Sequence, residues 1–132
     1  MDNDITTYDL TPTELRARRE ALGLDQQRLA RALNVGQGTI SQWELGKRPI
    51  PAGIDAELQR LEDVVTDLVT ATLRRVAADA GGMGDQPIIE IYAQDTDWWA
   101  AQPQYDGLPA TLQRVAMARV LVAARDGLRV GP

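Results

Sequence analysis

The 132-residue sequence contains no cysteine and no histidine. The lack of cysteine excludes disulfides and thiolate metal sites, and it suits a reducing compartment. The lack of histidine removes the usual zinc ligand, the Ser-His triad and the most frequent general base. Only carboxylates remain for metal binding or acid-base chemistry. We therefore expect a protein that is not an enzyme and that needs no metal or cofactor.

The sequence also lacks long apolar segments. No apolar run approaches the ~20 residues that a membrane-spanning helix requires, and no basic, apolar leader opens the chain. We expect a cytoplasmic protein. A chain of this length favours one domain with an appendage and a core of ordinary size.

The net charge of −5 is unevenly distributed along the chain. Residues 1–11 carry −3, residues 12–50 carry +3, and residues 51–132 carry −5. Phosphate would be attracted by the middle segment and repelled by the acidic remainder. The charge distribution therefore favours nucleic-acid contact by residues 12–50, and residues 1–10 are expected to be a flexible acidic arm.

Three short helices are predicted within residues 11–50. The segment Thr11-Pro12-Thr13-Glu14 has the pattern of a capped helix start, and Gly23 ends that helix. A second helix begins after Asp25, a capping residue, and carries an apolar face formed by Leu29, Ala30 and Leu33.

The segment Asn34-Val35-Gly36 breaks the second helix, because Asn and Gly enter left-handed conformations at low cost. A third helix begins near Gln37, turns Ile40 and Trp43 inward, and ends at Gly46. Its other face carries short or amide side chains that can meet base edges. A helix, a glycine-containing turn and a polar-faced helix are typical of helix-turn-helix proteins.

Residues 12–50 resemble the helix-turn-helix domain of the Cro/CI repressor class, also called the XRE-like regulators. The resemblance rests on Leu24-Asp25-Gln26-Gln27, Leu29-Ala30, Leu33, Val35, Gln37, Thr39-Ile40-Ser41, Trp43-Glu44 and Gly46-Lys47-Arg48, at the family's spacing and without a gap. It implies that Gln37, Thr39, Ser41 and Gln42 face the major groove. It also implies that Gln26, Lys47 and Arg48 hold phosphates, and that Arg19 pairs with Glu44.

Physical chemistry agrees with most of these roles. Gln37, at the amino end of its helix, can pair bidentately with adenine, and Thr39 and Ser41 can form hydrogen bonds or touch a thymine methyl. Gly36 and Gly38 depart from the family, which often has Ser, Thr or Gln there. At Gly38, either the backbone approaches a DNA phosphate closely or one base position is not read.

A long helix is predicted over about residues 51–80, because Ile54, Leu58, Leu61, Val65, Leu68 and Thr72 recur at steps of four and three. This stripe can form a dimer seam or can pack against its own chain. Gly81 to Asp85 reads as a flexible break.

A small α+β unit is expected over residues 85–132. It would contain a strand at residues 88–92, a short helix bearing Trp98 and Trp99, a helix from Pro109 to about Arg125 and a second strand at residues 128–130. The order of these elements is similar to the dimerisation unit of anti-CRISPR-associated helix-turn-helix regulators. The resemblance implies a homodimer, and we assign dimerisation to Leu58, Leu61, Val65, Leu68, Ile89, Ile91, Trp98 and Trp99.

The predicted fold is therefore mostly α. It consists of an amino-terminal helix-turn-helix bundle (residues 11–50), a long connecting helix and a small α+β dimerisation unit. The predicted function is a homodimeric, sequence-specific repressor of bacterial or phage origin, acting on a palindromic double-stranded operator.

Three alternatives stay open. The first is an antitoxin whose acidic carboxy-terminal half neutralises a basic toxin as its partner protein. The second is an enzyme that uses carboxylates and a divalent metal in residues 85–106, with Asp95, Asp97 and Asp106 as its acids, although solvated or capping acids explain these residues more simply. The third is a small-molecule sensor with a pocket near Trp98 and Trp99, although no polar groups are seen to converge there in the sequence.

Overall fold

The computed structural model describes residues 9–79, 87–125 and 129–130, with the side chains of the last two left out. The chain forms two compact units, unit 1 up to Glu62 and unit 2 from Asp63. The described residues are mostly helical, as predicted. No helix among them is both long and apolar enough to cross a membrane. The acidic arm over residues 1–10 and the break over residues 81–85 lie largely or wholly outside the described residues.

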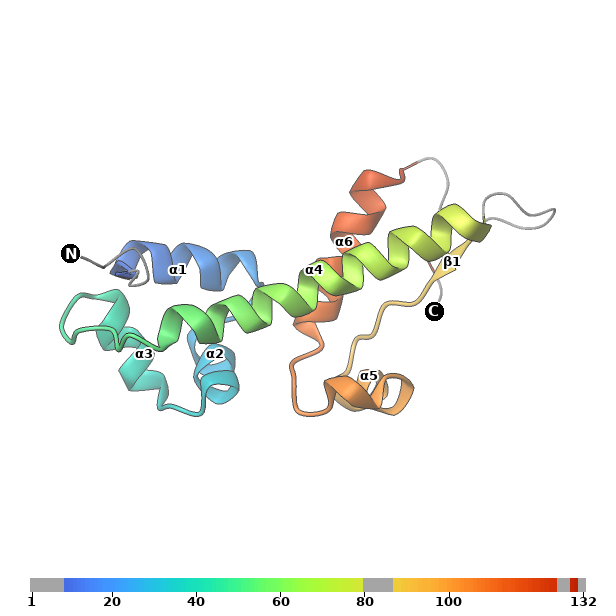
Figure 1. Ribbon diagram of the computed structural model, residues 1–132. Helices are drawn as coiled ribbons and strands as arrows, with labels where there is room; N and C mark the ends of the chain where they lie inside the picture. The colour runs from blue at the N-terminus through green and yellow to red at the C-terminus, as the bar shows by residue number, and fades with distance from the viewer. Residues whose placement is uncertain (1–8, 80–86, 126–128, 131–132) are drawn as a thin grey trace. The chain divides into compact units, whose positions relative to one another are not determined.

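Unit 1 contains α1 (Pro12–Ala21), α2 (Gln26–Leu33), α3 (Gln37–Glu44) and the first part of α4 (Ile54–Asp79) (Figure 1). The division between the units falls inside α4. Residues 54–62 thus belong with the three preceding helices, whereas the sequence placed the end of this domain at residue 50. The reason is packing, because Ile54, Leu58 and Leu61 are buried there.

The helix boundaries in unit 1 follow from local chemistry. The Thr11 hydroxyl accepts a hydrogen bond from the Glu14 amide and donates one to the Glu14 carboxylate, both at 3.1 Å, as the capping pattern predicts. The turn between α2 and α3 uses Asn34, which is left-handed at φ 58°. Gly36, by contrast, is extended at φ −78° and precedes α3 as its cap. The prediction that Gly36 supplies left-handed freedom was therefore wrong, because Asn34 alone makes the turn.

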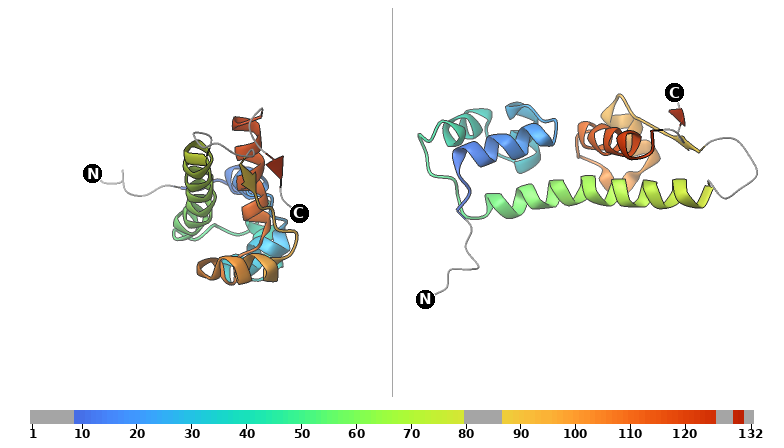
Figure 2. Two further views of the ribbon diagram at one scale, coloured as in Figure 1. Left: turned by 90° about the vertical axis from the view of Figure 1, so that its right-hand side faces the viewer. Right: turned by 90° about the horizontal axis from the view of Figure 1, so that it is seen from above.

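Unit 2 contains the rest of α4, the short strands β1 (Ile88–Ile89) and β2 (Arg129–Val130), α5 (Asp95–Ala101), a 3₁₀ turn (Pro103–Tyr105) and α6 (Thr111–Ala123). β1 and β2 pair in parallel, Ile88 with Arg129 and Ile89 with Val130. Figure 2 shows α6 and β1 alongside the carboxy-terminal part of α4. The fully buried Trp98 stacks on Tyr105, with ring centroids 4.9 Å apart.

The predicted strand over residues 88–92 is shorter than expected, because side chains of α6 replace a neighbouring strand after Ile89. The buried Gln113 donates to the Glu90 carbonyl at 2.7 Å and accepts from the Tyr92 amide at 3.1 Å. Arg114 donates to the Tyr92 carbonyl at 2.8 Å. The Glu90 carbonyl and the Tyr92 amide and carbonyl thus find partners on α6 without a β-ladder.

The residues assigned to dimerisation are mostly core residues of the single chain. Leu58, Leu61, Val65, Leu68, Ile89 and Trp98 are each at most 6% exposed, while Ile91 and Trp99 are half-buried. The indole N–H of Trp99 donates to the Leu108 carbonyl at 2.8 Å. The buried side chains cannot contact a second copy unless the unit opens. The packing alternative therefore accounts for the stripe on α4, while the assignment of these residues to a dimer interface stays a prediction.

Candidate nucleic-acid interface

The third helix presents one buried face and one polar, exposed face. Ile40 and Trp43 are 0% and 4% exposed. Successive residues of an α-helix are rotated by about 100°, so the side opposite Ile40 and Trp43 is centred on Gly38 and Gln42. Both of these residues are exposed. A short polar surface with its centre at Gly38 therefore faces away from the core.

The other predicted base-reading residues lie around this centre. Gln37 is exposed, and Ser41 is half-buried on the same side of α3. Thr39 is half-buried nearer to the core face. Gln37, Ser41 and Gln42 thus share one surface, while Thr39 lies at its border.

Two cations follow this surface directly. Lys47 and Arg48 are exposed, and their backbone amides donate to the Gln42 carbonyl at 2.8 and 3.3 Å. The Arg48 guanidinium also donates to the Gln42 side-chain oxygen at 3.4 Å. Gly46, left-handed at φ 73°, allows the chain to fold back in this way. The predicted phosphate-binding cations are therefore held beside the predicted base-reading face.

Residues 15–54 match the family model for the helix-turn-helix domain. This segment is an XRE-type helix-turn-helix domain. Its family is one of DNA-binding transcription regulators, and the match supports that role for this protein. No curated protein matches the chain.

A charged network joins the three helices of the helix-turn-helix domain. Arg19 on α1 donates to both oxygens of Glu44 on α3, at 2.7 and 3.0 Å, and to the Leu24 carbonyl at 2.9 Å. The side chains of Arg19 and Glu44 are only 10% and 4% exposed. Gln26 on α2 donates to the same carboxylate at 3.2 Å. The predicted Arg19–Glu44 pair is thus present and is almost fully removed from water.

The network also sets the protonation of Glu44. Burial tends to raise the pKa of this carboxyl, but the hydrogen bonds from Arg19 and Gln26 outweigh burial and lower the pKa below its ordinary value. Glu44 is therefore ionised at neutral pH. Because the Gln26 amide donates to Glu44, its assignment to a DNA phosphate requires a different rotamer or its second amide hydrogen.

Asp25 is a helix cap in the structure. Its carboxylate accepts from the Arg28 amide at 2.7 Å and from the Arg28 guanidinium at 2.8 Å. The ion pair partly neutralises a charge that would otherwise repel phosphate near the start of α2.

Sequence reasoning missed the role of Arg18. This residue donates to Asp55 and, through two nitrogens at 2.9 and 2.6 Å, to Glu62, both on α4. It therefore ties α1 to the part of α4 that lies in unit 1. The acidic partners lie about 40 positions away in the sequence, so no local pattern could have found them.

The acidic residues near the two tryptophans form no metal centre within the described part of the chain, where no group of three or more possible ligands occurs. Asp95 accepts from the Ala110 amide at 2.7 Å, which connects α5 to the start of α6. Asp95 thus has a structural role, in line with the simpler interpretation that these acids are caps or solvated side chains.

Proposed function

We propose that the protein is a homodimeric, sequence-specific repressor that binds an inverted-repeat operator. The observation that carries this proposal is the exposed polar face of α3, with Lys47 and Arg48 beside it, in an XRE-type helix-turn-helix domain. In this class the corresponding helix enters the major groove.

Recognition would divide between base edges and phosphates. Gln37, Ser41 and Gln42 carry hydroxyl or amide groups that can donate to and accept from base edges, and Thr39 can contact a thymine methyl from the border of the face. Lys47, Arg48 and the backbone near Gly38 would hold phosphates and fix the register of the helix. Transcription would be repressed because a dimer bound at the operator excludes polymerase from the promoter.

The dimer requires a surface that one chain leaves exposed. In unit 2 such a surface lies on α6, where Val115, Ala118, Arg119, Val122 and Ala123 form a shallow, almost wholly apolar patch. The opposite face of α6 is buried, with Leu112, Ala116 and Val120 at 0% exposure. A helix with apolar residues on both faces is typical of one that is covered on both sides. We therefore place the contact between copies on the α6 patch.

The first experiment selects operator sequences from random duplex DNA with the full chain and measures their affinity and stoichiometry. We expect an inverted repeat with half-sites about 10–10.5 base pairs apart, or a multiple of that spacing, bound by two chains. Recovery of no preferred sequence would refute sequence-specific recognition, and a single half-site bound by one chain would refute the dimer.

Gln37→Ala is expected to weaken binding to the selected operator by about 1–3 kcal/mol and to leave binding to random DNA unchanged, because a base contact carries specificity and a phosphate contact does not. Fluorescence anisotropy on both DNAs measures the difference. Gln104→Ala, an exposed glutamine of unit 2, is the matched control and should change neither affinity. Equal losses on both DNAs would remove Gln37 from the base-reading residues.

Val122→Glu is expected to convert the dimer into a monomer, because Val122 is 62% exposed within the α6 patch and burying a charged carboxylate in an apolar interface is costly. Light scattering on the full chain gives the mass. Leu45→Glu makes the same kind of change at a residue of unit 1 that is 64% exposed, and it should leave the mass unchanged. A dimeric Val122→Glu variant would place the interface elsewhere.

A further inference from the structure

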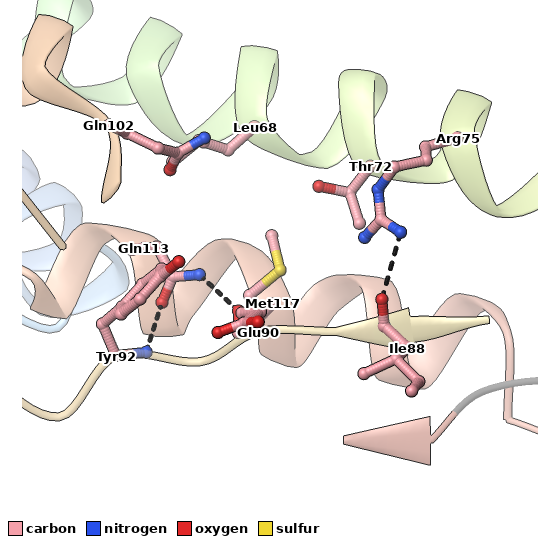
Figure 3. Close-up of a pocket in the computed structure, with 9 residues that line it drawn as sticks. All are labelled: Leu68, Thr72, Arg75, Ile88, Glu90, Tyr92, Gln102, Gln113 and Met117. Carbon is pink, nitrogen blue, oxygen red and sulfur yellow. Dashed lines mark hydrogen bonds between the residues drawn. The ribbon is translucent and has the colours of Figure 1, made fainter. Parts of the chain in front are cut away.

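Unit 2 contains a cavity of about 450 Å³, a volume within the range of small-molecule sites. Its walls come from α4, from the extended segment that begins with β1, from Gln102 at the end of α5, and from α6 (Figure 3). Neither Trp98 nor Trp99 lines it, so it is not the tryptophan pocket considered from the sequence. Polar groups do converge here, which the sequence alone did not reveal.

In two of the walls, the residues that line the cavity recur with the period of their secondary structure. Leu68, Thr72 and Arg75 follow one another at steps of four and three and thus share one side of α4. In the extended segment, Ile88 and Glu90 line the cavity, whereas Ile89 between them is fully buried on the other side. Alternation in a strand and the helical repeat together direct these side chains to a common space.

A cation and an anion lie on facing walls. The Arg75 guanidinium is held in place, because it donates to the Ile88 carbonyl at 3.0 Å, and it remains 48% exposed. Glu90 follows Ile88 by two residues, about 6.6 Å of extended chain, on the same side of the segment. Arg75 Nη1 also forms an ion pair with Asp79 Oδ2 at 3.6 Å, which is too long for a hydrogen bond. N–H groups of the guanidinium therefore remain able to bind a second carboxylate.

Two further polar groups line the cavity. The Gln102 side-chain oxygen accepts from the Trp98 indole at 2.7 Å, which leaves the amide hydrogens of Gln102 to face the cavity that the residue lines. The pKa of Tyr92 is raised by burial and by the charge of Glu90, consistent with a phenol hydroxyl near that carboxylate. Leu68 and Met117, 6% and 3% exposed, supply an apolar surface within the same cavity.

We propose that this cavity binds a small zwitterion of the aliphatic amino acid class. The ligand carboxylate lies at Arg75, its ammonium group at Glu90, and its side chain on Leu68 and Met117. The site belongs to unit 2 alone, and the proposal does not depend on DNA binding.

Three probes of equal chain length test the charges separately: norleucine, with both groups; hexanoate, with the carboxylate alone; and hexylamine, with the ammonium alone. Each is titrated into the isotope-labelled full chain and followed by NMR shifts. We expect norleucine to bind about 10-fold or more tightly than either single-charge probe, because charge-assisted hydrogen bonds are the strongest polar contacts. The shifts should map to the walls of the cavity.

The variants give a crossed pattern that misfolding cannot produce. Arg75→Gln should weaken norleucine and hexanoate about 10-fold or more and spare hexylamine. Glu90→Gln should weaken norleucine and hexylamine and spare hexanoate. Arg74→Gln removes the adjacent, exposed arginine that does not line the cavity, and it should change nothing.

Three results would overturn the proposal. The first is the absence of norleucine binding at millimolar concentrations, and the second is shifts that map outside the cavity. The third is an equal loss of affinity for all three probes in either variant, which would show that Arg75 and Glu90 do not bind the charged groups of the ligand.

Discussion

Replacing Glu44 with glutamine is expected to lower the free energy of unfolding of unit 1 by about 3–5 kcal/mol, because the change leaves the Arg19 guanidinium buried without its anion. A unit of this size has a total stability of only about 3–9 kcal/mol. The variant should therefore be partly unfolded in unit 1. Amide hydrogen exchange measures the loss in unit 1 separately from unit 2.

Two controls isolate the cause. Glu20→Gln removes the partner of Arg16 in a pair whose side chains are 65% and 57% exposed, so its cost should stay below about 0.5–1 kcal/mol. The double variant Arg19→Met/Glu44→Met removes both charges and should recover most of the lost stability. A Glu44→Gln loss no larger than that of Glu20→Gln would show that the network is not buried in solution.

The same pair predicts a pH dependence. Because the pKa of Glu44 is lower in the folded chain than its ordinary value of 4.5, its contribution is complete above that value and is lost as pH falls through the folded pKa. The stability difference between wild type and Glu44→Gln should thus shrink on acidification from neutral pH to below 4.5. A difference that is constant over this range would contradict the assigned ionisation.

Gly38→Ala is expected to stabilise the fold and weaken operator binding at the same time. Glycine within a helix costs about 0.5–1 kcal/mol relative to alanine. Nothing in the structure requires a glycine at position 38, because Gly38 has no positive φ and an added Cβ would meet nothing within 4 Å. At the centre of the exposed face of α3, we expect the missing side chain to allow a close approach of DNA. Crowding by the new methyl should weaken binding by about 1–3 kcal/mol.

The control for this prediction is Gly53→Ala. Gly53 also has open space at its Cβ and no positive φ, but it lies outside α3. Its replacement should leave operator affinity unchanged. Melting temperature and anisotropy on the selected operator are measured for both variants. Unchanged affinity in Gly38→Ala would favour the other reading, in which one base position is simply not contacted.

Local signals in the sequence predicted the helix-turn-helix well. A cap such as Thr11, an inward pair such as Ile40 and Trp43, and a helix end at Gly46 each depend on residues within one or two turns. The Arg19–Glu44 pair spans 25 positions, and it was predicted only because the family resemblance implied it.

The apolar period also predicted the long helix α4 correctly, but a period does not reveal which part of the protein covers the apolar stripe. The stripe at Leu58, Leu61, Val65 and Leu68 fits a second copy and the same chain equally well, because burial depends on what is brought near and not on the period. The tertiary structure covers it within the chain. The extended segment after Ile89 shows the same limit. Its β-branched residues favour extended backbone, but Gln113 and Arg114 provide the hydrogen-bond partners that a second strand would otherwise supply.

By itself, the sequence thus determined the helices, the turn at Asn34, the polar face of α3 and the class of nucleic-acid-binding domain. Each depends on backbone preference or on side-chain spacing within a single element. Only the tertiary structure decided which apolar faces are covered, that Arg18 reaches Asp55 and Glu62, and that Arg75 and Glu90 face one cavity. These features join residues that are distant in sequence, and their proximity is a property of packing.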